Sequence, residues 1–249
     1  MAAALVAAFV CLALCAAPAC AANEREDARL ALVVDDFGFV FGPVVRAFVD
    51  LPSAVAVTVI PGTPFAREVA SAAREAGHAV LIHLPMEPEG YPEFDPGEGA
   101  VMVADADSTV RAKVRKAIAA VPGAEGLNNH MGSRAMADPR IVQIVMEELR
   151  GAGLYFFDSH TGDASPARAI ARENGVRFAE NWRFWDTGYN EPAAIDSALV
   201  SLARRARRRG SAIGIGHPRR ASLEVVTRFL AGPEMKGVRL VPLAELLEN

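Results

Sequence analysis

The chain has 249 residues, of which 51% are hydrophobic and 22% are charged, and its formal net charge is −4. A chain of this length can bury a large core as one α/β domain, so it needs no disulfide to fold. The mildly negative charge argues against nucleic acid as the main partner, because nucleic-acid binding normally requires a basic field.

The N-terminal segment, residues 1–22, has no charged side chain and is rich in Ala, Leu and Val. It ends in small residues, and a short charged linker, residues 23–29, follows it. The pattern is typical of a secretory signal, which predicts a periplasmic or secreted protein. The alternative is an uncleaved anchor over residues 1–22, which would be the only contact with a membrane. All three cysteines lie in this segment, so the domain from residue 30 to residue 249 has no thiol chemistry.

From residue 30 onward, strand-like and helix-like patterns alternate. Apolar β-rich runs occupy residues 30–34, 54–60, 79–82, 154–157, 212–215 and 238–241, with shorter strands near residue 126 and at 176–179. Helical patterns occupy residues 65–76, 108–120, 139–151, 166–174, 193–209, 223–230 and 243–247. Such alternation predicts parallel βα units, and about eight of them suit a barrel better than an open sheet. A stretch rich in proline and glycine, residues 84–105, interrupts the alternation and is expected to be a binding loop or lid.

Polar residues suited to metal binding or proton transfer follow most of these strands. They are Asp35-Asp36, His83, Asn128-Asn129-His130, Asp158-Ser159-His160, Asp186 and His217. The carboxyl ends of parallel strands meet at one edge of a sheet, so these side chains should line one pocket. An aspartate and two histidines supply oxygen and nitrogen ligands to a divalent ion and leave positions open for water and substrate. That combination is typical of a catalytic zinc site.

Each of these motifs also has a structural interpretation. Asp35 and Asp36 could cap the turn that follows them, and His83 could be a structural residue at the end of its strand. As neighbours on a strand, the two aspartates are expected to point to opposite sides, so that one could bind a metal while the other acts as a base. His217 is either a general acid or a histidine packed under a loop. Trp182 and Trp185 could stack on sugar rings or belong to the core.

Taken in order, five stretches of the chain resemble the divergent polysaccharide deacetylase family, distant relatives of the NodB-type carbohydrate esterases. They are Val33-Val34-Asp35-Asp36-Phe37-Gly38, His83-Leu84-Pro85-Met86-Glu87-Pro88, Asn128-Asn129-His130-Met131-Gly132-Ser133, Phe157-Asp158-Ser159 and Ile215-Gly216-His217-Pro218. The resemblance extends from residue 30 to the C-terminus. It implies an irregular (β/α) barrel of the NodB type. It also implies a metal-dependent hydrolase, with zinc as the expected ion, that removes acetyl groups from an N-acetylated envelope glycan such as peptidoglycan.

The resemblance also implies roles for individual residues. In NodB-type deacetylases an Asp-Asp pair supplies the base and one metal ligand, two histidines complete the metal site, and a late histidine is the acid. Carried onto this chain, the resemblance implies Asp35 as the base, Asp36 and His83 as metal ligands, and His217 as the acid. Residues expected to bind substrate or support the site are Glu87, Asn129, Arg134, Asp158, His160 and Asp186.

The chain departs from the family pattern at several positions. The second motif histidine would fall at Glu87, so the third ligand is either His130, which we favour, or Glu87 itself. His160 stands where the divergent family suggests arginine, and Trp182-Arg183 replaces a stretch that usually bears aspartate. These last two departures bear on substrate preference more than on metal binding.

Two other functions remain compatible with the sequence. A non-catalytic envelope protein could keep the barrel and bind glycan or a protein partner, and the substitution at Glu87 favours this alternative. A two-carboxylate glycosidase would need acidic side chains facing a sugar across ~5–9 Å. The clustering of histidines at strand ends disfavours the glycosidase.

Overall fold

The computed structural model describes residues 28–162, 164–187 and 191–249. The expected signal or anchor, residues 1–22, lies outside these ranges, as does most of the expected linker. Ala28 and Arg29, which were assigned to that linker, already belong to the first strand. No helix within the described ranges is both long enough and apolar enough to cross a membrane.

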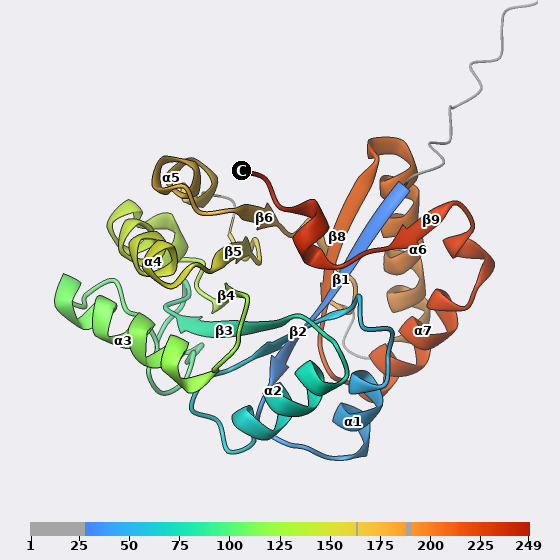
Figure 1. Ribbon diagram of the computed structural model, residues 1–249, viewed down its shortest axis with the longest axis horizontal. Coiled ribbons are helices and arrows are strands. Elements are labelled where there is room, and N and C mark those ends of the chain that lie inside the picture. Colours follow the sequence, from blue (N-terminus) through green and yellow to red (C-terminus); the bar gives the residue numbers. More distant parts are fainter. Residues whose placement is uncertain (1–27, 163, 188–190) are drawn as a thin grey trace, which may run out of the picture.

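The described residues form one nine-stranded sheet with helices around it (Figure 1). The strands are β1 Ala28–Phe37, β2 Ala56–Val59, β3 Val80–Met86, β4 Gly126–Met131, β5 Tyr155–Asp158, β6 Phe178–Glu180, β7 Arg183–Phe184, β8 Ser211–Gly216 and β9 Val238–Leu240. The α-helices are α1 Pro43–Val49, α2 Ala66–Glu75, α3 Asp107–Ala120, α4 Pro139–Ala152, α5 Ala167–Asn174, α6 Pro192–Arg209 and α7 Arg220–Leu230. Three short 3-10 helices are η1 Ala135–Ala137, η2 Pro233–Met235 and η3 Leu243–Leu246.

The strands follow the order β6-β5-β4-β3-β2-β1-β8-β7, and β9 adds beside the start of β1. The sheet curls, and the α-helices lie on its outer side (Figure 1). The end strands β6 and β7 are consecutive in the chain. Between them Asn181 N donates to Asp158 O at 2.9 Å, and Trp182 N donates to Ile213 O at 3.2 Å. One extended segment thus closes the curled sheet by changing partners, which confirms the predicted irregular (β/α) barrel.

Strand residues alternate between two buried clusters. Leu30, Leu32 and Val34 of β1 pack with apolar residues of the surrounding helices. Ala31 and Val33 pack instead with residues of β2, β3, β5, β8 and η3, and no described residue of α1–α7 joins them. Because successive strand residues point to opposite faces, this second cluster is the interior of the barrel.

The same alternation places polar side chains in the barrel interior at the carboxyl ends of the strands. We call this group the polar layer, and all of its members are buried: Asp35, Thr58, His83, Asn128 and Ser159. In each case the residue two positions earlier in the chain also points into the barrel and is apolar or a glycine. The apolar cluster beneath keeps water out from that side, so the polar layer is open only toward the loops at the carboxyl ends.

Helix α4 shows how local sequence sets the boundaries of these elements. The Asp138 carboxylate accepts hydrogen bonds from the first-turn backbone, and Pro139 occupies the first helical position. Gly153 ends the helix in the left-handed conformation, with a φ of 71°. Ile141 and Val145, four residues apart, lie on the buried face. These signals are local, so the sequence predicted this helix well.

Three elements differ from the sequence-based expectations. Helix α1 was not predicted, because its seven residues bury only Val45 and Phe48, too few for a helical period to show. The helix expected at residues 243–247 is a single 3-10 turn after Pro242. Strand β4 runs on to Met131, so Asn128-Asn129-His130, expected to follow a short strand near residue 126, belong to that strand and pair with β3.

Candidate metal centre

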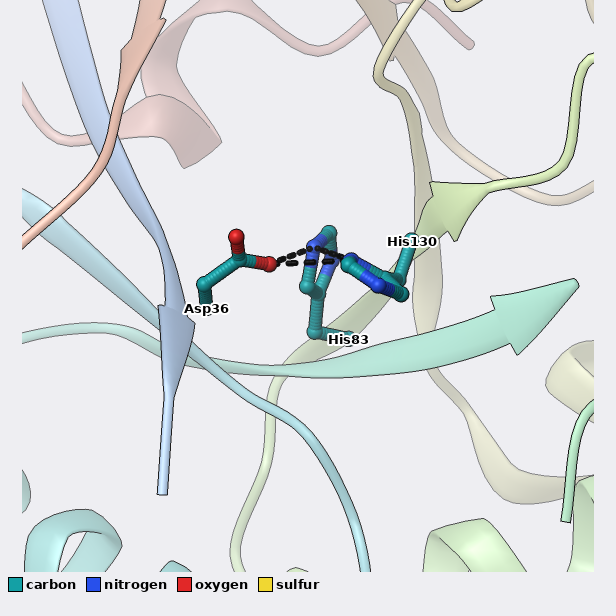
Figure 2. A group of neighbouring side chains, drawn as sticks. All are labelled: Asp36, His83 and His130. Carbon is teal, nitrogen blue, oxygen red and sulfur yellow. Dashed lines mark hydrogen bonds and ion pairs between the residues drawn. The ribbon is translucent and has the colours of Figure 1, made fainter. Parts of the chain in front are cut away.

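Asp36, His83 and His130 point toward one another at the carboxyl end of the sheet (Figure 2). Asp36 Oδ1 lies 3.1 Å from His83 Nε2 and 2.9 Å from His130 Nδ1. The two nitrogens are 3.2 Å apart. The three atoms form a nearly equilateral triangle with one oxygen and two nitrogen corners, carried by β1, β3 and β4.

The backbone at Asp36 brings its carboxylate into this triangle. Its φ of 64° lies in the left-handed region, and the register of β1 against β2 shifts between Val34 and Phe37. As a result both aspartates face one imidazole: Asp35 Oδ2 is 3.6 Å and Asp36 Oδ1 is 3.1 Å from His83 Nε2. The expectation that the two side chains point to opposite sides is therefore wrong. A non-glycine residue in this conformation stores strain, which is common at functional sites.

Asn128 connects the two sides of the polar layer. Its amide nitrogen donates to Asp35 Oδ1 at 3.0 Å, to Asp35 Oδ2 at 3.1 Å and to Ser159 Oγ at 3.0 Å. Its amide oxygen lies 2.9 Å from His83 Nδ1. With this amide orientation, His83 Nδ1 donates the hydrogen bond, so Nε2 of the neutral ring presents its lone pair to the triangle. Thr58 Oγ1 donates to Asp35 Oδ1 at 2.8 Å and completes the support of that carboxylate.

A divalent cation fits the three donor atoms. Ligands ~2.0–2.1 Å from a tetrahedral ion stand about 3.3 Å apart, close to the separations seen between Asp36, His83 and His130. Asp36 Oδ1 is buried and, within the described part of the chain, has no hydrogen-bond partner of good geometry despite the two adjacent nitrogens. An orphaned carboxylate oxygen facing two imidazole nitrogens is the chemistry expected of a ligand set.

The charges of this group are strongly coupled. Burial acts to raise the pKa of Asp36, but the contacts with His130 and His83 outweigh it and hold that pKa well below its usual range. Burial acts to lower the pKa of His83, but the carboxylates of Asp35 and Asp36 outweigh it and raise that pKa. The carboxylates thus favour a proton on the His83 ring, and a bound cation would compete with that proton.

His217 lies near the second carboxylate oxygen of Asp36, not the one that faces His83 and His130. Its Nε2 is 3.7 Å from Asp36 Oδ2. Its Nδ1 lies 2.9 Å from Asp186 Oδ1, and its backbone N donates to Asp186 Oδ2 at 2.7 Å. Burial acts to lower the pKa of His217, but the hydrogen bond and charge of Asp186 raise it, and Asp36 adds to the effect. This arrangement favours the protonated form of His217 beside the triangle, the form that a general acid needs.

Two glycines of β8 that precede His217, Gly214 and Gly216, leave room for the side chain of Trp185. A side-chain carbon at Gly216 would lie 2.2 Å from the Trp185 ring, and one at Gly214 would lie 2.4 Å from Leu202. Trp185 is buried in the core, and Asp186 follows it directly. The packing of the indole therefore sets the position of the carboxylate that holds His217. Of the two interpretations offered for Trp185, the structure supports the core residue.

Comparison with known proteins agrees with this geometry. The profile of the divergent polysaccharide deacetylase family matches residues 32–247. The chain belongs to this family. An uncharacterized protein of Haemophilus influenzae is 36% identical over 227 residues, covering 89% of this chain and 77% of the relative. YibQ of Escherichia coli, also uncharacterized, is 36% identical over 202 residues, covering 81% of this chain but only 62% of YibQ.

Solved structures support the fold of this divergent polysaccharide deacetylase. The uncharacterized protein ATU2773 of Agrobacterium tumefaciens superimposes with a TM-score of 0.82 at 25% identity, over 88% of this chain and 89% of its own. A candidate polysaccharide deacetylase of Mycobacterium smegmatis superimposes with a TM-score of 0.55 at 14% identity, over 89% of each chain. The more distant likeness bears on the fold alone, and it agrees with the NodB-type barrel.

Two of the expected supporting residues of the deacetylase domain pair with each other beside the centre. Glu87 is buried, but its Oε1 accepts from Arg134 Nη1 at 2.8 Å and its Oε2 from Val103 N at 2.6 Å. Among the described residues, the group able to hold a metal contains Asp36, His83 and His130 and not Glu87. Glu87 instead ties Arg134 to the proline-rich loop that follows β3.

Other predicted site residues hold loops around the centre. Asn129 accepts from Ser159 N at 2.9 Å and donates to Met131 O at 2.8 Å, which joins the ends of β4 and β5. Asp158 accepts from His160 N at 2.8 Å, and burial raises the pKa of Asp158. The exposed ring of His160 pairs with Glu180 through Nδ1 at 2.5 Å. None of these three side chains belongs to the triangle.

Two members of the polar layer that support Asp35 received no individual role from the sequence. Thr58 was not considered, and Asn128 was placed in the pocket only as part of Asn128-Asn129-His130. Strand alternation could have found both, because each is a polar residue at an inward position of a strand. The sequence did place Asp186 in the pocket, but it did not predict the hydrogen bond between Asp186 and His217.

Proposed function

We propose that this protein is a zinc-dependent carbohydrate deacetylase that hydrolyses the acetamide of an N-acetylated envelope glycan. The observation that carries the proposal is the triangle of Asp36, His83 and His130, with the Asp35 carboxylate and the His217 ring both close to it. Family membership supports the reaction class. The composition of residues 1–22 supports export as part of the same proposal.

The three triangle atoms would hold the divalent cation, which, when bound, polarises the acetyl carbonyl and favours ionisation of a nearby water. Asp36 supplies the negative ligand. The hydrogen bond from His83 Nδ1 to Asn128 keeps the lone pair of His83 Nε2 available. His130 contributes Nδ1 from the partly exposed edge of the site. The open side of the triangle is left for water and substrate.

Proton transfer is assigned to the two groups that flank the triangle. Asp35 Oδ1 accepts from both Thr58 and Asn128, whereas Oδ2 accepts from Asn128 alone and keeps capacity for a proton. Asp35 takes a proton from the water that attacks the acetyl carbon. His217, held protonated by Asp186, gives its proton to the amine nitrogen as the C–N bond breaks. The products are acetate and the free amino sugar.

Acetate release tests the proposal directly. The full chain is incubated with zinc and either N-acetylglucosamine oligomers or peptidoglycan fragments. Metal-dependent acetate release is expected from the wild type, with a loss of about 100-fold or more in Asp35→Asn and in His217→Ala. Arg204→Gln, which changes an exposed arginine on α6, serves as the control. The absence of zinc-dependent release from both glycan classes would contradict the proposal.

Glycan binding without turnover is the second candidate function. The observation that favours it is the burial of Asp35, whose side chain is only 2% exposed and accepts three hydrogen bonds within the polar layer. Under this alternative, the wild type and Asp35→Asn would bind the same oligomers with equal affinity, and neither would release acetate. Binding is measured by titration calorimetry on the samples used for the acetate assay.

A further inference from the structure

A cleft opens beside Phe184, the last residue of β7. It has a volume of about 510 Å³, and its lining includes His160, Trp182, Arg183 and Phe184. The Phe184 ring stacks on the His217 imidazole, with centroids 6.1 Å apart and planes 8° apart. A molecule in this cleft that contacts Phe184 is therefore separated from the proposed acid by one ring.

Two arginines meet at one tryptophan in the wall of this cleft. The guanidinium carbon of Arg205 lies 4.6 Å from the centre of the Trp182 ring, and that of Arg183 lies 5.4 Å from it. Both guanidinium groups thus make cation–π contacts with the same indole ring. Trp182 remains 36% exposed and Arg183 is exposed, so both are accessible to a ligand.

The positive charge of this pair is not balanced nearby. Within the described ranges neither Arg183 nor Arg205 forms an ion pair, although many other arginines of the chain do. Partial burial lowers the pKa of Arg205, and the charges of Arg209 and Arg208 lower it further. An anion at the pair would relieve this repulsion.

Two acidic side chains near the cleft, Glu180 and Asp186, are engaged by other residues of the chain. The carboxylate of Glu180 pairs with His160 through one oxygen and with Arg168 through the other. Asp186, below Phe184, is buried and bonded to His217 and Ser222. Neither carboxylate forms an ion pair with Arg183 or Arg205.

We propose that the cleft binds a sugar residue carrying a carboxylate or phosphate group, next to the acetyl-bearing residue at the metal centre. The substrate is thus an acidic glycan rather than a neutral one, an inference that rests on the proposed deacetylase function. Arg183 binds the anionic group. Arg205, which contacts the same Trp182 ring, adds a second positive charge close to it. Phe184 offers an apolar face to the sugar ring.

Binding of three probes of equal length to the full chain tests this inference. The probes are a neutral N-acetylglucosamine tetramer, a tetramer containing N-acetylmuramic acid, and an N-acetylglucosamine tetramer with a terminal phosphate. The wild type is expected to bind at least one anionic probe about 10-fold more tightly than the neutral one. Arg183→Gln and Arg205→Gln should abolish this preference while leaving the affinity for the neutral tetramer within about 2-fold. The carboxylate and phosphate probes distinguish the two anionic groups.

Arg204→Gln is the matched control, because it removes the same charge from an exposed position one residue away on α6. The Arg204→Gln variant should keep the full preference for anionic probes over the neutral tetramer. Equal affinity of the wild type for all three probes, or a preference that survives Arg183→Gln and Arg205→Gln together, would overturn the inference. Zinc-dependent acetate release from each of the three probes is recorded separately. If release is absent from all three probes while the anionic preference is present, the deacetylase proposal fails and the binding site stands.

Discussion

His83 and Asn128 lie opposite each other in the register of β3 and β4, and a 2.9 Å hydrogen bond joins their side chains. The same amide bonds to both oxygens of Asp35. One buried side chain therefore sets the tautomer of a proposed metal ligand and the position of the proposed base. Neither His83 nor Asp35 can shift without breaking a bond to Asn128.

Replacing Asn128 by alanine should weaken both the fold and the metal site. The change leaves buried atoms of Asp35 and His83 without partners, which costs about 3 kcal/mol of unfolding free energy. Zinc affinity should fall about 10- to 100-fold, because a residue that orients ligands has been lost. Chemical denaturation and zinc titration measure the two effects.

Asn129→Ala is the control for this experiment. Asn129 is equally buried, but its bonds join loops rather than the triangle. The Asn129→Ala variant should be less stable than the wild type but keep its zinc affinity within about 3-fold. Equal zinc affinity in the two variants would show that Asn128 does not orient the ligands.

The identity of the third ligand can be tested by metal analysis. His83→Ala and His130→Ala should each lose stoichiometric zinc, because each removes one corner of the triangle. Glu87→Gln should retain zinc, since the Glu87 carboxylate bonds to Arg134 and to the Val103 backbone. Zinc is measured in protein dialysed against a defined concentration of free metal. If His130→Ala retains zinc and Glu87→Gln loses it, the third ligand is Glu87 and not His130.

The ion pair between His217 and Asp186 predicts a pH effect. In the folded protein the pKa of His217 is raised above 6.5 by Asp186, so the stabilisation is fully present below about pH 6.5. It is lost as the pH rises through the raised pKa. Asp186→Asn should lower the pKa of His217, and the alkaline limit of activity should move down with it. Titration of the His217 ring by NMR checks the shift without requiring turnover. An unchanged His217 pKa in Asp186→Asn would contradict the assignment.

The packing of Trp185 predicts which glycines tolerate a side chain. A methyl group at Gly216 would meet the Trp185 ring at 2.2 Å, so Gly216→Ala should cost about 1–3 kcal/mol and displace Asp186. Gly151 lies within helix α4, and a side-chain carbon there would meet nothing within 4 Å. Gly151→Ala should stabilise by about 0.5–1 kcal/mol. Thermal and denaturant unfolding compare the two variants, and similar stabilities would refute the packing argument.

The amino-acid sequence alone determined the βα alternation, the barrel and the strand ends that carry Asp36, His83 and His130. Those features are local, and parallel strands bring their carboxyl ends together whatever the details of packing. The sequence also allowed His130 or Glu87 as the third ligand. It could not choose between them, because that choice depends on how β4 pairs with β3.

Only the tertiary structure decided how these residues meet. The register that sets Asn128 opposite His83 carries His130 to the triangle, while Glu87 turns to Arg134. The left-handed backbone at Asp36 turns its carboxylate to the same imidazole that Asp35 faces, against the ordinary alternation of a strand. Strand register and a strained dihedral are set by packing across the whole barrel, and packing between distant segments leaves no local pattern in the sequence.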